Sequence, residues 1–361
     1  MSNIAQYYKK RMIIASISDK KYHFSLYNFE WPKIIRIFDR MYTQESDMTN
    51  FEIIKCHGSG NDFIMVDTTR MDNAAAIDWS AFARIACNRT HGIGSDGVLL
   101  VVRNDKGIYG MDMLNPDGTH AEMCGNGIRC VARLAQERGY LDSELLTSGG
   151  RTFPARRAES VAEGIETFSV DIPITTWSPS FAFFNRDERF VGRVIETLDG
   201  ELQFTALNLG NPHIVAAVEN IDMSLLERLG ERVKELKEEF PHGVNVSLYK
   251  VLSPTSIFVA TYERGAGITL SCGTAMTASS TAATLLRYVD EGSKIEVYNR
   301  GGKVACRTAL KENTITTTLE GNATFEWMGE ARFDNTNFAY DILHTTGEAD
   351  RWIEFVESLN K

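Results

Sequence analysis

The chain has 361 residues, 43% hydrophobic, 24% charged and 10% aromatic, which predicts a folded protein of about two domains. Its formal net charge of −10 disfavours nucleic-acid binding or membrane-surface binding, and no apolar run approaches the ~18 residues of a membrane-spanning helix. Six cysteines without a C-x-x-C pair exclude a disulfide-rich scaffold and argue against a structural zinc site. We therefore expect a cytoplasmic protein with reduced thiols and no metal.

Residues 1–50 differ from the rest of the chain in charge. They contain eight Lys or Arg and five Asp or Glu, whereas the remainder is strongly acidic. No apolar segment follows the basic cluster, as it would in a secretory signal, and five acidic residues are atypical of a transit peptide. We expect a dispensable extension, with Met48 as an alternative start directly before the first well-patterned strand.

From residue 51 the predicted elements follow one another closely. Residues 51–67 (FEIIKCHGSGNDFIMVD) have the pattern of a strand, a glycine turn and a strand. Residues 79–102 predict a helix, a glycine loop and a buried strand. After the turn NPDGT, a helix is predicted to begin at Cys124 and to stop at Gly139.

The second half contains a similar set of elements after a predicted crossing at residues 168–179. The apolar residues within 224–240 would fall on one side of a helix, which predicts an amphipathic helix without a functional role. Residues 256–263 (SIFVATYE) predict a strand, and a helix rich in small residues begins at Cys272. Residues 350–359 predict a short amphipathic helix in a tail to which no role is assigned.

Two segments share one plan, AEMCGNGIRCVARLA and ITLSCGTAMTASSTAA. Each leads from a predicted strand into Cys-Gly and then into a helix, which places Cys124 and Cys272 at helix N-termini. Unpaired N–H groups and the helix dipole stabilise a thiolate there, and the same N–H groups can hold a carboxylate. The following glycine lets the backbone approach a ligand closely.

Paired thiols in this setting suit the racemisation or epimerisation of an amino acid without a cofactor. A thiolate removes the Cα proton while the opposing thiol supplies a proton to the other face. Amides at the helix ends stabilise the negative charge that develops on the substrate carboxylate. The alternatives are that the cysteines are small buried hydrophobic residues, or that they form a disulfide, which a reducing compartment disfavours.

Five separated blocks resemble the diaminopimelate epimerase family and occur in the family's order: HGSGNDF, NPDGTHAEMCGNGIRC, GNPH, GVNV and YERGAGITLSCGT. The resemblance covers about residues 51–330, three quarters of the chain. It implies an α/β (α+β) fold of two pseudo-symmetric domains, each a curled, mainly antiparallel sheet around a central helix, with the site in the cleft between them. We expect an extension over 1–50, a first domain over 51–168 with about 320–330 returning to it, a second domain over 169–319 and a tail over 331–361.

The resemblance implies a cofactor-independent enzyme that interconverts LL- and meso-diaminopimelate in lysine and peptidoglycan precursor synthesis. Family members are commonly homodimers. By motif, Cys124 and Cys272 match the catalytic cysteines, and His213 lies near them in an uncertain role. The substrate-contacting positions match Asn61, Asn115, Gly125, Asn126, Asn211, Asn245, Glu263, Arg264, Gly273 and Thr274.

The chemistry of the substrate agrees with this assignment. A distal carboxylate favours a guanidinium such as that of Arg264, and asparagines orient both ends without adding charge. Without the resemblance, Asn115 and Asn211 would be interpreted as turn formers. Arg264 would be interpreted as a solvated surface residue, and His213 as a structural hydrogen-bonding residue. One departure is Ala275, where the family usually has glycine, and the polar run that follows it.

Other functions remain open. GIGSDG (92–97) matches G-x-G-x-x-G, but a helix precedes it and a strand follows, the reverse of a dinucleotide site. No G-x-S-x-G, P-loop or H-E-x-x-H motif occurs. The same fold could act on histidine, proline or a lanthionine-like amino acid, or it could bind an amino acid without catalysis.

Overall fold

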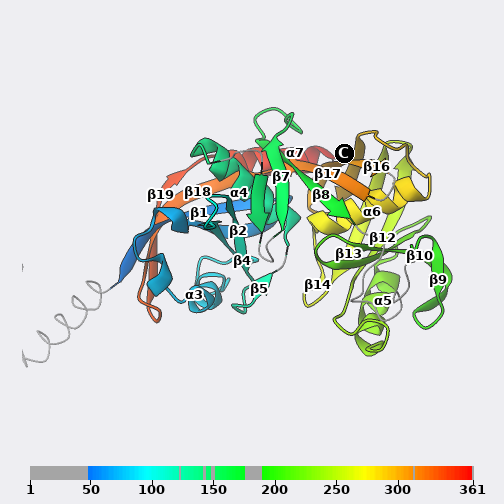
Figure 1. The fold of residues 1–361 in the computed structure, drawn as a ribbon, viewed down its shortest axis with the longest axis horizontal. Helices are drawn as coiled ribbons and strands as arrows, with labels where there is room; N and C mark the ends of the chain where they lie inside the picture. The colour runs from blue at the N-terminus through cyan, green and yellow to red at the C-terminus, as the bar shows by residue number, and fades with distance from the viewer. Residues whose placement is uncertain are drawn as a thin grey trace, which may run out of the picture. The chain divides into compact units, whose positions relative to one another are not determined.

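The computed structural model describes residues 48–121, 123–140, 144–147, 151–174, 189–311 and 314–359 (Figure 1). Residues from Thr49 to the C-terminus form one compact unit. The extension expected over residues 1–50 lies almost wholly outside the described residues. The unit begins where the first strand was predicted, since β1 starts at Thr49.

The first half of the unit runs from β1 to β8. Its elements are β1 (Thr49–Gly58), β2 (Asn61–Asp67), the short 3-10 turns Thr68–Arg70 and Ala74–Ala76, α3 (Trp79–Ala86), β3 (Val98–Arg103), β4 (Tyr109–Leu114), β5 (His120–Ala121), α4 (Gly125–Glu137), β6 (Glu144–Thr147), β7 (Thr152–Arg157) and β8 (Thr167–Ile174).

The second half runs from β9 to β17 and is followed by three further elements. Its members are β9 (Arg193–Ile195), β10 (Asp199–Asn208), β11 (Pro212–Ala217), α5 (Met223–Glu235), β12 (Asn245–Ser253), β13 (Ser256–Glu263), β14 (Gly267–Ile268), α6 (Gly273–Leu285), β15 (Ile295–Asn299), β16 (Gly302–Lys311) and β17 (Thr314–Asn322). The chain ends with β18 (Thr324–Phe333), β19 (Phe338–Thr345) and α7 (Glu348–Leu359).

The two halves repeat one topology, strand for strand. The antiparallel hairpin β1–β2 corresponds to β10–β11, and a helix then leads to a parallel neighbour, β3 in one half and β12 in the other. The antiparallel pairs β3–β4 and β12–β13 follow, and the central helices α4 and α6 then lead to the parallel strands β6 and β15. The repeat confirms the predicted pair of pseudo-symmetric domains.

The halves join along β8 and β17, which pair antiparallel over their whole lengths. β8 also pairs with β7, and β17 with β16. The expected boundary at residues 168/169 therefore falls inside β8, in the shared part of the sheet. β18 returns to the first half by pairing with β1, as predicted for residues near 320–330.

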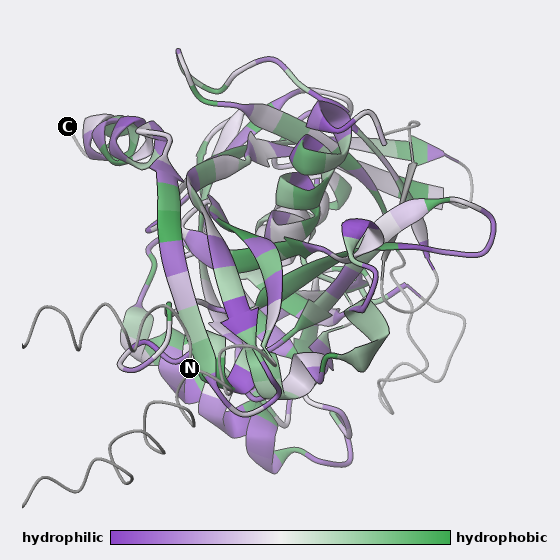
Figure 2. Cartoon of the chain, turned by 90° about the vertical axis from the view of Figure 1, so that its left-hand side faces the viewer, coloured by the Kyte–Doolittle hydropathy of each residue, from purple (hydrophilic) through white to green (hydrophobic). Residues whose placement is uncertain are grey.

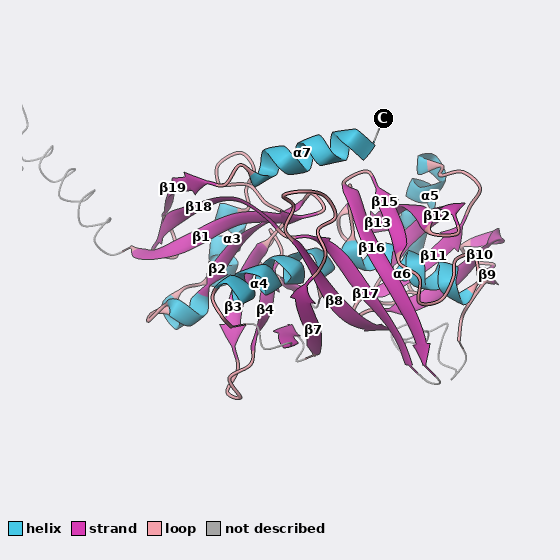
Figure 3. Cartoon of the chain, turned by 90° about the horizontal axis from the view of Figure 1, so that it is seen from above, coloured by secondary structure: helices cyan, strands magenta, loops and turns pink. Residues whose placement is uncertain are grey.

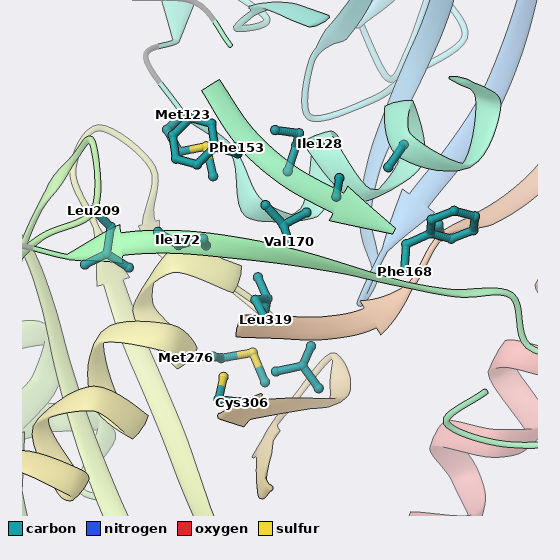
Figure 4. Packing of buried hydrophobic residues seen from close by; sticks show 14 of the residues in the cluster. Met123, Ile128, Phe153, Phe168, Val170, Ile172, Leu209, Met276, Cys306 and Leu319 are labelled. Carbon is teal, nitrogen blue, oxygen red and sulfur yellow. The ribbon is translucent and has the colours of Figure 1, made fainter. Parts of the chain in front are cut away.

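One apolar core spans both halves because α4 and α6 are each enclosed by strands (Figures 1 and 4). Val170 and Ile172 of β8 and Leu319 of β17 lie between Ile128 of α4 and Met276 of α6 (Figure 4). Two separate apolar clusters bury α5 and α3 against the strands. These helices lie on the face of the sheet opposite to the face that packs on α4 and α6. The expected amphipathic helix at residues 224–240 is thus confirmed as α5.

The polar run of α6 is fully buried, which is unusual for a helix with six Ser or Thr residues. Thr277 and Thr281 donate their hydroxyls to backbone carbonyls one turn earlier, each at 2.8 Å. A hydroxyl chain then links Thr281 to Thr317 and Thr308 on neighbouring strands, at 2.8 and 2.9 Å. These contacts explain how the departure after Cys272 is accommodated.

The C-terminal tail is an ordered part of the fold. The predicted helix at residues 350–359 is confirmed as α7, whose polar and apolar faces are visible in Figure 2. The tail expected from residue 331 begins instead inside β18, and β19, which the sequence analysis did not predict, pairs with it. Figure 3 shows α7 crossing from β18 toward β15 and β16.

Trp352 and Glu348 attach α7 to both halves. The Trp352 ring covers Gly302 at the start of β16 and lies 5.6 Å from the His57 ring of β1. Glu348 accepts hydrogen bonds from Arg133 of α4, at 2.7 Å, and from the amide of Phe325, at 3.0 Å.

Replacing Trp352 by alanine is expected to destabilise the protein by about 3 kcal/mol, because a buried indole leaves a cavity. Urea unfolding measures the loss. Ile353→Ala is the matched control, since Ile353 directly follows Trp352 in α7 but is 53% exposed. Equal stability of the two variants would show that α7 is not docked through Trp352.

Candidate active site

Cys124 and Cys272 occupy equivalent positions directly before α4 and α6, as predicted. Their backbones are nearly identical, with φ/ψ of −135°/108° at Cys124 and −130°/109° at Cys272. The amide of Gly127 donates to Sγ of Cys124 at 3.4 Å, and the amide of Ala275 lowers the pKa of the Cys272 thiol. Each thiol therefore faces the N–H groups of a helix start.

The two helix starts lie against each other. A Cβ atom at Gly273 would lie 2.8 Å from Oδ1 of Asn126, and one at Gly125 would lie 3.7 Å from the amide nitrogen of Thr274. Glycine at position 273 is thus required for the close approach of α4 and α6. Four of the positions that the resemblance implies for substrate contact, Gly125, Asn126, Gly273 and Thr274, meet here.

Asn61 lies beside Cys124, at the start of β2. Its Oδ1 accepts a hydrogen bond from Nδ2 of Asn126 at 3.2 Å and lies 3.8 Å from Sγ of Cys124. The second half repeats the arrangement, since Nδ2 of Asn211 donates to Oγ1 of Thr274 at 3.2 Å. The Thr274 hydroxyl in turn lies 3.4 Å from Sγ of Cys272.

His213 and Asn245 extend this second set. Nε2 of His213 lies 3.0 Å from Oδ1 of Asn211 and 3.4 Å from Nδ2 of Asn245. Oδ1 of Asn245 accepts from the backbone amide of Arg264 at 2.8 Å. Burial lowers the pKa of His213 to about 3, so the ring is neutral at physiological pH. His213 therefore acts here as a hydrogen-bonding residue without charge.

Glu263, the last residue of β13, points toward the Cys272 thiol. Its Oε1 accepts a hydrogen bond from Thr269 at 2.5 Å. Burial raises the pKa of the Glu263 carboxyl, while hydrogen bonds to Thr269 and Cys272 lower it. The pKa of each of Cys124 and Cys272 is raised first by burial and further by the Glu263 carboxylate. A small cavity beside Cys272 is lined by Thr261, Thr269, Leu270, Ser271, Asn299 and Arg300.

Arg264 and Asn115 are not in contact with the thiols in the described structure. Arg264 is exposed and donates to the carbonyl of His242 at 2.9 Å. Nδ2 of Asn115 donates to Oγ1 of Thr119 at 3.0 Å, within the NPDGT turn. The two residues occupy equivalent positions, directly after β4 and directly after β13. Turn formation accounts for the observed contacts of Asn115.

Two further residues, Asp96 and Arg129, contact this set and were not predicted from sequence. Asp96, in the GIGSDG segment, accepts a hydrogen bond from Nδ2 of Asn61 at 2.7 Å. Arg129 of α4 donates to Oδ1 of Asn126 at 3.0 Å. A glycine-rich segment with no dinucleotide context was the available signal for Asp96. Arg129 follows Cys124 by five residues and carried no signal of its own.

The thiols are protonated at neutral pH, which differs from the thiolate expected at a helix start. Burial raises the pKa of Cys124 to about 11, although the amides of Gly127 and Asn126 lower it. Burial also raises the pKa of Cys272 well above its usual value. Both cysteines are free, as are the other four.

The rate of Cys124 alkylation by iodoacetamide is expected to rise about tenfold per pH unit from about pH 7 to about pH 10. A raised thiol pKa means that the thiolate fraction keeps growing over this range. Mass spectrometry of the labelled peptide measures the rate, with free cysteine as a control that levels off earlier. A plateau below about pH 8 would contradict the raised pKa.

No cluster of three or more His, Cys, Asp or Glu side chains suited to a metal ion occurs in the described part of the chain. Likewise, none of the described helices is long and apolar enough to cross a membrane.

The family model of diaminopimelate epimerase matches residues 53–154 and 205–326, one segment in each half. The chain belongs to the diaminopimelate epimerase family. A diaminopimelate epimerase of Clostridium acetobutylicum is 36% identical over 88% of this chain and 97% of its own length. One from Listeria welshimeri is 37% identical over 80% of this chain and 90% of its own. The protein is therefore an isomerase, an epimerase by family.

Solved structures agree on the fold of this epimerase. A hydroxyproline epimerase from Agrobacterium vitis superposes with a TM-score of 0.54 at 13% identity, over 81% of this chain and 94% of its own. At this identity the likeness concerns the architecture alone. It confirms the two-domain fold that the sequence predicted.

Proposed function

We propose that this epimerase interconverts LL- and meso-diaminopimelate, with Cys124 and Cys272 as the two bases and without a cofactor. The observation that carries the proposal is the pair of equivalent thiols at two helix starts that touch through Gly125 and Gly273. Membership of the family supports the substrate.

In the proposed reaction one sulfur is a thiolate and the other a thiol. The thiolate takes the Cα proton, and the electron pair of the broken C–H bond delocalises into the carboxylate. The other thiol then delivers its proton to the opposite face of Cα, which completes the inversion and leaves the thiolate on the second sulfur. Amides of Gly125, Asn126, Gly273 and Thr274 hold the carboxylate and stabilise its developing charge.

Glu263 supplies a route to the thiolate despite the raised thiol pKa values. Its carboxylate faces Cys272, and burial raises the pKa of this carboxyl, which strengthens it as a base toward the thiol. We assign it to accept the Cys272 proton when that sulfur acts as the base. This role is proposed in addition to the substrate contact that the family resemblance implies for Glu263.

The distal end of the substrate is assigned to Arg264 with Asn115, Asn211 and Asn245. Arg264 is exposed and lies one residue beyond Glu263, so its guanidinium is available to a carboxylate. We further propose a cytoplasmic homodimer that serves lysine and peptidoglycan precursor synthesis, as the family resemblance implies.

The deciding experiment incubates reduced protein with LL-diaminopimelate in heavy water without added cofactor. Deuterium at Cα together with meso product is expected. Neither signal from a folded, reduced sample would overturn the proposed substrate. Histidine, proline and lanthionine are then tested as substrates of a different epimerase. Silence across that set, with retained binding of an amino acid after thiol alkylation, would identify a non-catalytic binding protein.

A further inference from the structure

A chain of hydrogen bonds runs past Cys124 and links two oppositely charged residues. Arg129 Nη2 donates to Oδ1 of Asn126 at 3.0 Å, and Nδ2 of Asn126 donates to Oδ1 of Asn61 at 3.2 Å. Nδ2 of Asn61 then donates to Oδ2 of Asp96 at 2.7 Å. The chain connects α4, the start of β2 and the GIGSDG segment, which are far apart in the sequence.

The two ends of the chain allow one direction only. A guanidinium only donates hydrogen bonds, and an ionised carboxylate only accepts them. An asparagine amide can otherwise turn over and exchange its oxygen for its nitrogen at little cost. A donor at one end and an acceptor at the other therefore fix the orientation of both amides between them.

Neighbouring backbone and side-chain oxygens hold the Arg129 guanidinium in place. Its side chain is fully buried, and its other donors go to the carbonyls of Gly125 and Asn322, at 2.9 and 3.2 Å, and to the Ser59 hydroxyl, at 3.3 Å. All these oxygens are neutral, and no ion pair to Arg129 occurs among the described residues. A Cβ atom at Gly321 would lie 2.9 Å from its Cζ, so the guanidinium has no room to shift.

Asp96 provides the opposite end at the protein surface. Its second oxygen, Oδ1, pairs with Arg89 at 2.7 Å, and its side chain is 42% exposed. The carboxylate is thus anchored on one oxygen and presents the other to Asn61. This contact gives the GIGSDG segment a role that its glycine pattern does not reveal.

We propose that Arg129 and Asp96 are positioning residues that fix the amides of Asn126 and Asn61, so that Oδ1 of Asn61, and not Nδ2, faces Cys124. The inference rests on the proposed function, in which Cys124 is one of the bases. An acceptor beside the sulfur orients the thiol proton, whereas an N–H donor would stabilise the thiolate and weaken it as a base.

Variants at Asp96 test the chain of hydrogen bonds at its surface end, where the fold tolerates substitution. Asp96→Ala removes the acceptor of the Asn61 amide, together with the contacts of Asp96 with the Asp62 amide and with Arg89. It is expected to lower kcat about tenfold, with KM nearly unchanged, since the charge-assisted hydrogen bond to Asn61 is lost. Asp96→Asn keeps an acceptor without the charge and is expected to lose less, about threefold. Arg89→Gln is the comparison variant, because it removes the ion pairs of Arg89 with Asp96 and Asp62 but leaves the Asn61 contact; its kcat should fall less than that of Asp96→Ala.

Variants at Arg129 test the other end. Arg129→Lys keeps a donor-only side chain, whereas Arg129→Gln offers both a donor and an acceptor and so loses the direction. Lysine is expected to retain more turnover than glutamine among folded variants. If neither Arg129 variant folds, the turnover and alkylation of Asp96→Ala and Asp96→Asn test the proposal.

Alkylation of Cys124 provides a measurement that needs no substrate. In Asp96→Ala the freed Asn61 amide can present Nδ2 to the sulfur, so the alkylation profile should shift to lower pH than in Asp96→Asn, which has lost the same charge. Equal profiles and equal turnover in these two variants, or wild-type turnover in Asp96→Ala, would overturn the proposal. A wild-type protein that is inactive on diaminopimelate would instead refute the proposed function. The alkylation profiles would still test the role of the hydrogen-bond chain.

Discussion

Replacing either Cys124 or Cys272 by alanine is expected to abolish interconversion of LL- and meso-diaminopimelate, with a loss of at least about 10³-fold in kcat/KM. Each variant lacks one of the two groups that must act on opposite faces of Cα. Meso product formation, followed by chromatography of the stereoisomers, measures the loss. Circular dichroism shows whether the fold is kept.

Cys306→Ala is the matched control for the cysteine variants. Cys306 is a buried thiol of β16 that faces α6, outside the paired helix starts, and burial raises its pKa to about 12. Its removal should cost stability without a comparable loss of turnover. If Cys124→Ala or Cys272→Ala kept a tenth of the wild-type activity, the two-base scheme would be wrong, and a mechanism through Glu263 alone would replace it.

The positions of Cys124 and Cys272 at two helix starts were predictable from sequence because their signals are local. A strand, a Cys-Gly step and a helix of small residues recur in both halves, and the matched backbone angles at Cys124 and Cys272 follow from that repeated plan. The amphipathic pattern of α5 and the glycine stop after α4 are local in the same sense. For these elements, pattern and capping chemistry were sufficient.

The parts that sequence reasoning missed depend on contacts between distant segments. Asp96 reaches Asn61 across 35 positions, and Arg129 meets Asn322 across 193. A glycine-rich motif was recognised and rejected as a dinucleotide site, but nothing local showed that its aspartate faces β2. β19 was missed because its exposed residues lack the alternation of a half-buried strand.

The state of the thiols also required the structure. A helix start alone predicts a thiolate, and the amides do lower the pKa of Cys124. Burial in the joined cores of the two halves has the larger effect, and burial is a property of the whole fold. The same holds for His213, whose role the GNPH motif left open and which burial keeps neutral.

Because the two halves repeat one topology, the residues around Cys124 can be compared with the equivalent residues around Cys272. Glu263 ends β13 and acts on the Cys272 thiol, whereas the equivalent last residue of β4 is Leu114, which is apolar and buried. Cys124 instead faces Oδ1 of Asn61, held by Asp96. Two sulfurs related by pseudo-symmetry therefore have different partners, as expected for bases that act on opposite stereoisomers.

Gly273→Ala is expected to lower kcat/KM by about 100-fold or more while leaving the protein folded. Alanine at a helix position normally stabilises the helix by up to about 1 kcal/mol relative to glycine. Here the added methyl group would lie 2.8 Å from Oδ1 of Asn126, the atom that accepts from Arg129. Asn126 must therefore move, which opens the contact between the two helix starts that we propose as the site of the substrate carboxylate.

The measurement pairs turnover in heavy water with thermal unfolding. Gly200→Ala is the control, because Gly200 has an ordinary backbone φ and a Cβ there would meet only a carboxylate oxygen of Glu196, at 3.4 Å. Turnover should fall in Gly273→Ala alone, with the midpoint of unfolding within about 5 °C of the wild type in both variants. Full activity in Gly273→Ala would mean that substrate does not require the close approach of α4 and α6. The carboxylate would then have to be held by side chains such as Arg264 instead of by the amides at the helix starts.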